Sequence, residues 1–160
     1  MNKRILRFSN EKDKEILTAP CRDFNPQADM QIVEDLYDTF EAHKKEALGL
    51  SANQIGYAVR AFITRDPTSG QLVVLTNPSV TMKSKETYLG QEGCLSNDDP
   101  SKLFYVQRHR AISVWATAYT KYNDGGLIKY RSGVKAYTNI NKLPAQVFQH
   151  ELDHLAGKVI

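Results

Sequence analysis

Residues 149–154 read QHELDH and contain the pattern H-E-x-x-H. On a helix, His150 and His154 are one turn apart, so their imidazole rings point to a common spot and can hold one metal ion. Glu151 follows the first histidine, and its carboxylate can reach a water on that ion without displacing it. The motif constrains the fold strongly, because it requires a helix here whose two imidazoles meet further ligands from elsewhere in the chain.

The residues around the motif argue against an alternative in which the two histidines are merely solvated on a surface helix. Phe148, Leu152 and Leu155 form an apolar stripe, as expected for a helix that packs on a core. Pro144 suits a first helical position, and Gly157 is well placed to end the helix. The sequence therefore predicts a packed helix that begins near Pro144.

The motif leaves one ligand of the expected metal site unassigned. A catalytic site of this kind usually has three protein ligands, and familiar H-E-x-x-H peptidases take the third, a glutamate or a histidine, from a later part of the chain. No glutamate or histidine follows His154 in this sequence. The third ligand is therefore expected upstream, where the candidates are several carboxylates, two cysteines and two histidines: Cys21, Cys94, His43 and His109.

These four residues differ in their surroundings. His43 falls on the polar side of a predicted helix, and His109 lies between two arginines that would repel a cation, so both are expected to be exposed to solvent. Cys21 is expected to be a small buried hydrophobe. Cys94 follows Gly93 and has an uncrowded thiol, although a lone cysteine is more often structural. The residues by themselves leave the choice of third ligand open.

The rest of the chain predicts short strands with helices near both ends. Residues 28–47 carry apolar side chains at helical spacing, which predicts an amphipathic helix on the core. Segments rich in β-branched and aromatic residues predict strands at 60–64, 72–76, 112–119 and 127–131, the last two as a hairpin around NDGG. The pattern is typical of an α+β fold and lacks the alternation of a βαβ repeat.

Composition and charge exclude several classes of protein. The 160 residues suit one domain, and 41% hydrophobic with 24% charged residues is typical of a globular protein. A net charge of +3 does not indicate a dedicated nucleic-acid-binding surface. No apolar run approaches the roughly 20 residues that span a membrane, and the N-terminus does not read as a signal peptide. We therefore expect a cytoplasmic protein whose two cysteines remain thiols.

Three segments resemble, in this order, the three signature motifs of the peptide deformylases: GLSANQIG (49–56), EGCLS (92–96) and QHELDHLAG (149–157). The resemblance covers the chain from about residue 47 onward, whereas the first forty residues fit the family only loosely. It implies the family's α+β fold, in which antiparallel sheets surround a central C-terminal helix that carries H-E-x-x-H. It also implies a single catalytic domain over residues 1–160, without a C-terminal extension.

The resemblance implies a metal-dependent hydrolase that removes the N-formyl group from the N-terminal formylmethionine of newly made proteins and releases formate. In the family the cysteine of EGCLS is the third metal ligand, which makes Cys94 the partner of His150 and His154. A hydroxide on the metal would attack the formyl carbon. Glu151 would take up the proton and deliver it to the departing amine.

Other roles carry over from the same motifs. The side-chain amide of Gln54 and the backbone N–H of Leu95 would stabilise the oxyanion. Leu48 and Gly49 would bind the substrate backbone as an added strand. Val147, next to the metal-binding face of its helix, would line the pocket for the methionine side chain.

The identity and the surroundings of the metal are less constrained. One cysteine and two histidines suit zinc, and iron(II), nickel and cobalt are compatible. The resemblance favours iron(II) as the physiological ion. Arg108 matches a family arginine and is expected either to pair with Asp153, which would hold the metal-binding helix in place, or to be solvated.

The expected partners are N-formylmethionyl nascent peptides, with transient proximity to the ribosome, no membrane contact and a monomeric protein. Two alternatives remain. A metallopeptidase that cuts internal peptide bonds is disfavoured by EGCLS and by the missing downstream ligand. A non-enzymatic member that only binds nascent peptides or the ribosome is disfavoured because every catalytic position is present.

The sequence also departs from the family pattern. Ala47 replaces the first glycine of the leading motif, and Gly90 stands where many members have a larger apolar residue. The segment NDDPSKLF (97–104) is about two residues longer than in common bacterial forms, which puts substrate contacts beyond methionine in doubt. The family's C-terminal tail is not found, so no tether to the ribosome is expected. None of these departures touches a proposed ligand.

Overall fold

The computed structural model describes residues 1–160, and its helices and antiparallel strands form an α+β fold. Helices α1 (Glu11–Thr18) and α2 (Met30–His43) precede the strands, and α3 (Lys142–Leu155) follows them. Five strands form one sheet in the order β1-β2-β3-β6-β7, and β4 with β5 forms a second sheet. The bounds are β1 Gly49–Ser51, the 3-10 helix η1 Ala52–Ile55, β2 Ala61–Arg65, β3 Leu72–Lys83, β4 Thr87–Glu92, β5 Phe104–His109, β6 Ala111–Asp124 and β7 Leu127–Asn141.

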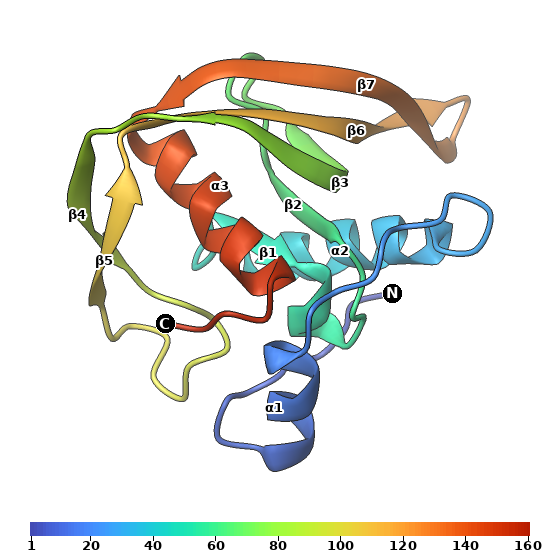
Figure 1. The fold of residues 1–160 in the computed structure, drawn as a ribbon. Coiled ribbons are helices and arrows are strands. Elements are labelled where there is room, and N and C mark those ends of the chain that lie inside the picture. Colours follow the sequence, from blue (N-terminus) through green and yellow to red (C-terminus); the bar gives the residue numbers. More distant parts are fainter.

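Helix α3 runs through the middle of the molecule and contacts both sheets (Figure 1). It packs against β1, β2, β6 and β7 of the large sheet and against β5 of the small one. The predicted arrangement, antiparallel sheets around a central motif-bearing helix, is therefore confirmed.

Buried apolar side chains lie on both faces of the large sheet at β2 and the first part of β3. Strands β2 and β3 pair so that Phe62 lies opposite Leu75 and Ile63 opposite Val74. Phe62 and Leu75 belong to a core that also contains residues of α3, whereas Ile63 and Val74 belong to a core with residues of α2. Because both faces are covered there, β2 and the first part of β3 (residues 72–78) are almost continuously buried, whereas residues 79–83 alternate between exposed and half-buried.

The packing of α3 explains why the motif helix is held rigidly. Phe148 is fully buried and meets the rings of Phe62 and Tyr137 edge-on, at centroid distances of 5.6 and 5.7 Å. The helix begins at Lys142, slightly before the expected Pro144, because β7 leads directly into it. Gly157, with φ +77°, ends it in the left-handed conformation that the sequence predicts.

Other elements differ from the expected ones. Helix α2 ends at His43 and does not continue to residue 47. Strand β3 continues past the expected residue 76, because Asn77 takes a left-handed φ of 48° and the pairing with β6 shifts register there. The β6–β7 hairpin extends beyond both predicted strands, and α1, β4 and β5 were not predicted.

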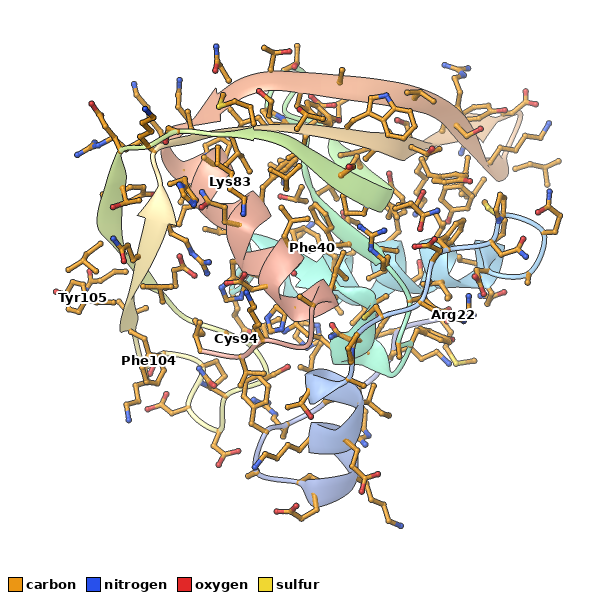
Figure 2. The ribbon with its side chains drawn as sticks, in the orientation of Figure 1. Arg22, Phe40, Lys83, Cys94, Phe104 and Tyr105 are labelled. Atoms are coloured by element: carbon orange, nitrogen blue, oxygen red, sulfur yellow. The ribbon has the colours of Figure 1, made fainter.

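Side chains from distant parts of the chain approach α3. Figure 2 shows Cys94 beside this helix, while Tyr105 on β5 points away from the molecule. Phe40 of α2 is buried beneath the large sheet.

No helix of the structure combines the length and the apolar character needed to cross a membrane.

Candidate metal centre and active site

Three side chains with metal-ligating atoms converge beside the second half of α3. The Nε2 atoms of His150 and His154 are 3.1 Å apart, and Cys94 Sγ lies 3.4 Å from His154 Nε2. The three ligand atoms all lie within 4.8 Å of one another. Cys94 and His154 are buried and His150 is half-buried, so the cluster is largely shielded from solvent.

The donor set fits a tetrahedral divalent metal. Metal–nitrogen bonds of about 2.0–2.1 Å and a metal–sulfur bond of about 2.3 Å give tetrahedral edges of about 3.3 Å between nitrogens and about 3.6 Å between nitrogen and sulfur. The observed 3.1 and 3.4 Å are close to these edges. The two imidazoles direct Nε2 atoms at each other, an arrangement that a shared cation would stabilise. The residues present are therefore suited to the metal that the sequence predicts.

Glu151 lies beside this cluster and has little freedom. Its Oε2 atom is buried and has no hydrogen-bond partner. On the other side of the carboxylate, a Cβ built on Gly49 would lie only 2.8 Å from Glu151 Oε1. Only glycine at position 49 leaves room for the carboxylate at its present position.

Burial and neighbouring charges set the protonation of these groups. Burial raises the pKa of Glu151 to about 7. Burial, reinforced by the charge of His150, lowers the pKa of His154 well below its ordinary value. Burial also acts to lower the pKa of His150, but its hydrogen bonds with Cys94 and Glu92 outweigh this and raise the pKa to about 10. A carboxyl group with a pKa of about 7 is suited to take up and release a proton near neutral pH.

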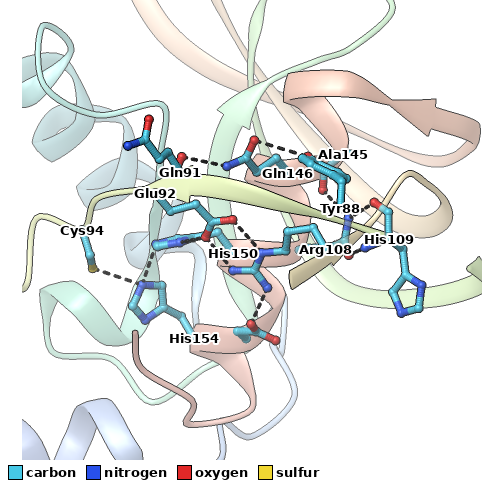
Figure 3. A network of polar contacts seen from close by, with 12 residues as sticks. Tyr88, Gln91, Glu92, Cys94, Arg108, His109, Ala145, Gln146, His150 and His154 are labelled. Carbon is cyan, nitrogen blue, oxygen red and sulfur yellow. Dashed lines mark hydrogen bonds and ion pairs between the residues drawn. The ribbon is translucent and has the colours of Figure 1, made fainter. Parts of the chain in front are cut away.

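A buried network of charges orients His150 from behind (Figure 3). Glu92 Oε1 lies 2.8 Å from His150 Nδ1, which leaves Nε2 facing the cluster. Arg108 donates to both oxygens of Glu92, at 2.7 and 2.6 Å, and to Asp153 Oδ2 at 2.6 Å. Burial alone would raise the pKa of Glu92, but these bonds lower it to about 2. The expected pairing of Arg108 with Asp153 is confirmed, and the solvated alternative is wrong because Arg108 is buried.

Sequence reasoning missed Glu92, although the signal was present. Glu92 is the last residue of β4 and Cys94 follows two residues later, and residues two apart in extended chain share a face. A carboxylate on the same face as the expected ligand was therefore a candidate to support one of the histidines. Hydrophobic patterns do not show this, because they treat every charged residue as exposed.

Residues around η1 contact the backbone of His154 and fix the orientation of the Gln54 side-chain amide. Gln54 Oε1 accepts hydrogen bonds from the backbone N–H and the hydroxyl of Ser51, at 3.0 and 3.1 Å. Its Nε2 consequently faces Ser96 Oγ at 3.2 Å and Cys94 Sγ at 3.5 Å. Asn53 Nδ2 donates to the carbonyl of His154 at 2.6 Å, which ties this segment to α3.

The N-terminal segment braces the loop after Cys94. Arg7 Nη1 donates to the carbonyls of Leu95 and Asn97, at 2.7 and 2.6 Å. The backbone N–H of Phe8 bonds to the carbonyl of Ser96 at 3.0 Å. Sequence reasoning missed this contact, because residues so far apart in the chain give no local signal.

A pocket of about 280 Å³ opens beside the cluster. It is lined by the expected substrate residues Leu48, Gly49 and Val147, and also by Gln54, Leu95 and Glu151. Further lining residues were not foreseen and come from β4, the loop after it and α3: Gln91, Pro100, Leu103, Leu143 and Gln146. The expected substrate and catalytic positions therefore meet around one cavity.

The other candidate ligands lie outside the cluster. His109 is half-buried and its Nδ1 lies 2.7 Å from the Ser84 carbonyl, so the expected solvent exposure of this histidine is wrong. His43 is also half-buried, with Nδ1 2.9 Å from the carbonyl of Thr39. Cys21 is half-buried, and burial raises the pKa of its thiol to about 11.

Comparisons with known proteins agree with this geometry. The family model for polypeptide deformylase matches residues 3–160. Peptide deformylase 2 of Clostridium perfringens is 34% identical over 155 residues, which cover 97% of this chain and 88% of that protein. The chloroplastic/mitochondrial peptide deformylase 1B of Arabidopsis thaliana is 30% identical over 129 residues, which cover 79% of this chain but only 41% of that longer protein.

A solved structure supports the fold independently. The crystal structure of a probable peptide deformylase from Synechococcus phage S-SSM7 aligns with a TM-score of 0.71 and 24% identity, covering 99% of this chain and 97% of that one. With the family model spanning nearly every residue and the three motifs meeting at one cavity, the chain belongs to the peptide deformylase family of hydrolases.

Proposed function

We propose that this chain removes the formyl group from the N-terminal formylmethionine of newly made proteins and releases formate. The observation that carries the proposal is the convergence of Cys94, His150 and His154 with the buried carboxylate of Glu151, beside a pocket that Cys94, His150 and Glu151 line. Family membership supports the same reaction. Water adds to the formyl carbon, the carbon–nitrogen bond breaks, and the amine leaves as a free N-terminus.

Cys94, His150 and His154 would hold one divalent metal ion. Iron(II) is favoured by family resemblance, and zinc, nickel and cobalt suit the same ligands. Such an ion supplies Lewis acidity and lowers the pKa of a water molecule. Glu92 contributes from behind, because its bond to His150 Nδ1 fixes the ring with Nε2 facing the ion.

Glu151 would act as general base and then as general acid. Its pKa of about 7 and its unpartnered Oε2 support this role. The carboxylate takes the proton of the attacking water and returns it to the nitrogen of the departing amine. Gly49 supports the step indirectly, since it leaves the space in which the carboxylate lies.

The oxyanion would be stabilised by Gln54 Nε2 and by the backbone N–H of Leu95. The hydrogen bonds from Ser51 to Gln54 Oε1 support this assignment, because they turn the NH₂ group toward Cys94. The bond from Arg7 to the Leu95 carbonyl keeps this part of the loop in place. Preorganised donors of this kind need no rearrangement during the reaction.

The peptide would bind along β1, with its first side chain in the pocket. Strand β1 is one of the two edge strands of the large sheet, so Gly49 and the preceding Leu48 can offer backbone groups to an added strand. Val147 would contact the methionine side chain. We further propose one catalytic domain over residues 1–160 that acts as a monomer in a cytoplasm, transiently near the ribosome.

Hydrolysis of formyl-Met-Ala-Ser beside a casein substrate tests the proposal. The metal-loaded protein should release formate from the peptide and leave casein intact. Cleavage of casein alone would identify an ordinary metallopeptidase. Glu151→Gln should lose turnover while it still binds metal, whereas a protein that merely binds nascent peptides would release no formate with or without this change.

A further inference from the structure

Gln146 occupies space that another side chain could fill. A Cβ built on Gly90 would lie 2.6 Å from Gln146 Nε2 and 2.8 Å from Gln146 Cδ, closer than real Cβ atoms approach a neighbour. The φ of Gly90 lies outside the left-handed region, so its backbone would accept a side chain. The amide of Gln146 is therefore the reason that position 90 has no room for one.

This amide is anchored at both of its ends. Gln146 Nε2 donates to the carbonyl of Gln91 at 2.8 Å, and Gln146 Oε1 accepts from the hydroxyl of Tyr88 at 3.3 Å. Gly90 lies between Tyr88 and Gln91 on β4, so the amide lies over this glycine. Figure 3 shows the amide of Gln146 with its contacts to Tyr88 and Gln91. Two hydrogen bonds on one side chain restrict its rotamers and hold the amide over Gly90.

The anchored side chain of Gln146 also lines the pocket beside the metal ligands. Gln146 lines that pocket together with Val147 and Leu143, which precede His150 on α3. The space over Gly90 is therefore filled from α3, by the anchored polar side chain of Gln146.

We propose that Gln146 is a specificity-determining residue, whose amide over Gly90 closes the side-chain pocket and limits the size of the first residue that the enzyme accepts. This inference rests on the proposed function and deepens it. Removal of the amide would join the space over Gly90 to the pocket and admit a bulkier side chain. An apolar side chain restored at position 90 would close the pocket again.

The test compares kcat/KM for formyl-Met-Ala-Ser and formyl-Phe-Ala-Ser with the full metal-loaded chain. Gln146→Ala should raise the Phe-to-Met ratio of kcat/KM about tenfold, and at least fivefold. Small differences in side-chain size change kcat/KM by about 10–200-fold in an apolar pocket. The double variant Gln146→Ala/Gly90→Leu should return the ratio to within about threefold of the parent. Gln146→Met keeps most of the volume and should change the ratio less than Gln146→Ala does.

Gln107→Ala is the matched control, because Gln107 is an exposed glutamine on β5 whose side chain bonds only to Thr87 and lies outside the pocket. A rise of less than fivefold in Gln146→Ala, or an equal rise in Gln107→Ala, overturns the inference. If Gln146→Ala does not fold by circular dichroism, Gln146→Asn is judged by the same criterion. Failure of the unaltered protein to hydrolyse either peptide would overturn the proposed function itself, which separates the two results.

Discussion

Replacement of Arg108 by methionine is expected to destabilise the fold strongly. Arg108 makes three hydrogen bonds of 2.6–2.7 Å to Glu92 and Asp153. The side chains of Arg108 and Glu92 are each only 5% exposed. Methionine fills a similar volume, so the main effect of Arg108→Met is to leave the carboxylate of Glu92 buried without its cation. Breaking a buried pair in this way costs about 3–5 kcal/mol, a large part of the 5–15 kcal/mol that stabilises a typical domain.

Urea unfolding at pH 7 measures this loss, with chelator present so that metal binding does not contribute. The control is Arg110→Met, because Arg110 is 60% exposed and pairs loosely with Glu86 at 3.5 Å. This control should lose less than about 1 kcal/mol. The double variant Arg108→Met/Glu92→Gln removes both charges and should be more stable than Arg108→Met alone. A loss in Arg108→Met no larger than that of the control would show that Arg108 does not compensate the buried charge of Glu92.

Three further predictions concern other parts of the chain. Arg7→Met should lower kcat about tenfold or more with KM little changed, because Arg7 no longer holds the loop that carries the Leu95 N–H. Arg7→Lys should recover part of the lost kcat. A fall in kcat with an equal rise in KM would argue for a general structural role. Burial acts to raise the pKa of Asp66, but hydrogen bonds from Lys135 and Tyr137 lower it to about 2. Asp66 therefore adds about 1–2 kcal/mol to the free energy of unfolding above its ordinary pKa, and this contribution is lost as pH falls from about 4 to 2. The unfolding curves of the parent and of Asp66→Asn should converge in that pH range. Gly157→Ala should lower the melting temperature by several degrees, because φ is +77° and the new Cβ would meet backbone atoms of a neighbouring segment.

The parts of the fold that were predictable carry local chemical signals. Helix α3 combines an apolar stripe, a proline in its first turn and a glycine just after its end, and each signal acts within a few residues. The prediction for strand β3 ended at residue 76, directly before Asn77 and Pro78, two residue types that are unfavourable inside strands. The structure accommodates them, since the Asn77 side chain bonds to the backbone N–H and carbonyl of Phe24. That partner lies far away in sequence, and no local pattern could indicate it.

In the candidate site, too, residues within local motifs were predictable, whereas residues that depend on distant partners were not. The motif positions were predictable because each of the three motifs is specific and their order matches one family. The network of Glu92 and Arg108 was not fully predicted, because buried charges depend on partners that only the tertiary structure brings together. The sequence also did not predict that the amide of Gln146 fills the space beside Gly90, since a glycine in a sequence does not indicate which distant side chain packs against it.

Cobalt(II) substitution tests whether Cys94, His150 and His154 together bind one metal ion. The protein, loaded under anaerobic conditions, should bind one cobalt per chain and show a thiolate-to-cobalt charge-transfer absorption. Cys94→Ala should lose this absorption and most of the cobalt, whereas Cys21→Ala should keep both. An absorption that survives in Cys94→Ala, or one that disappears in Cys21→Ala, would contradict the account.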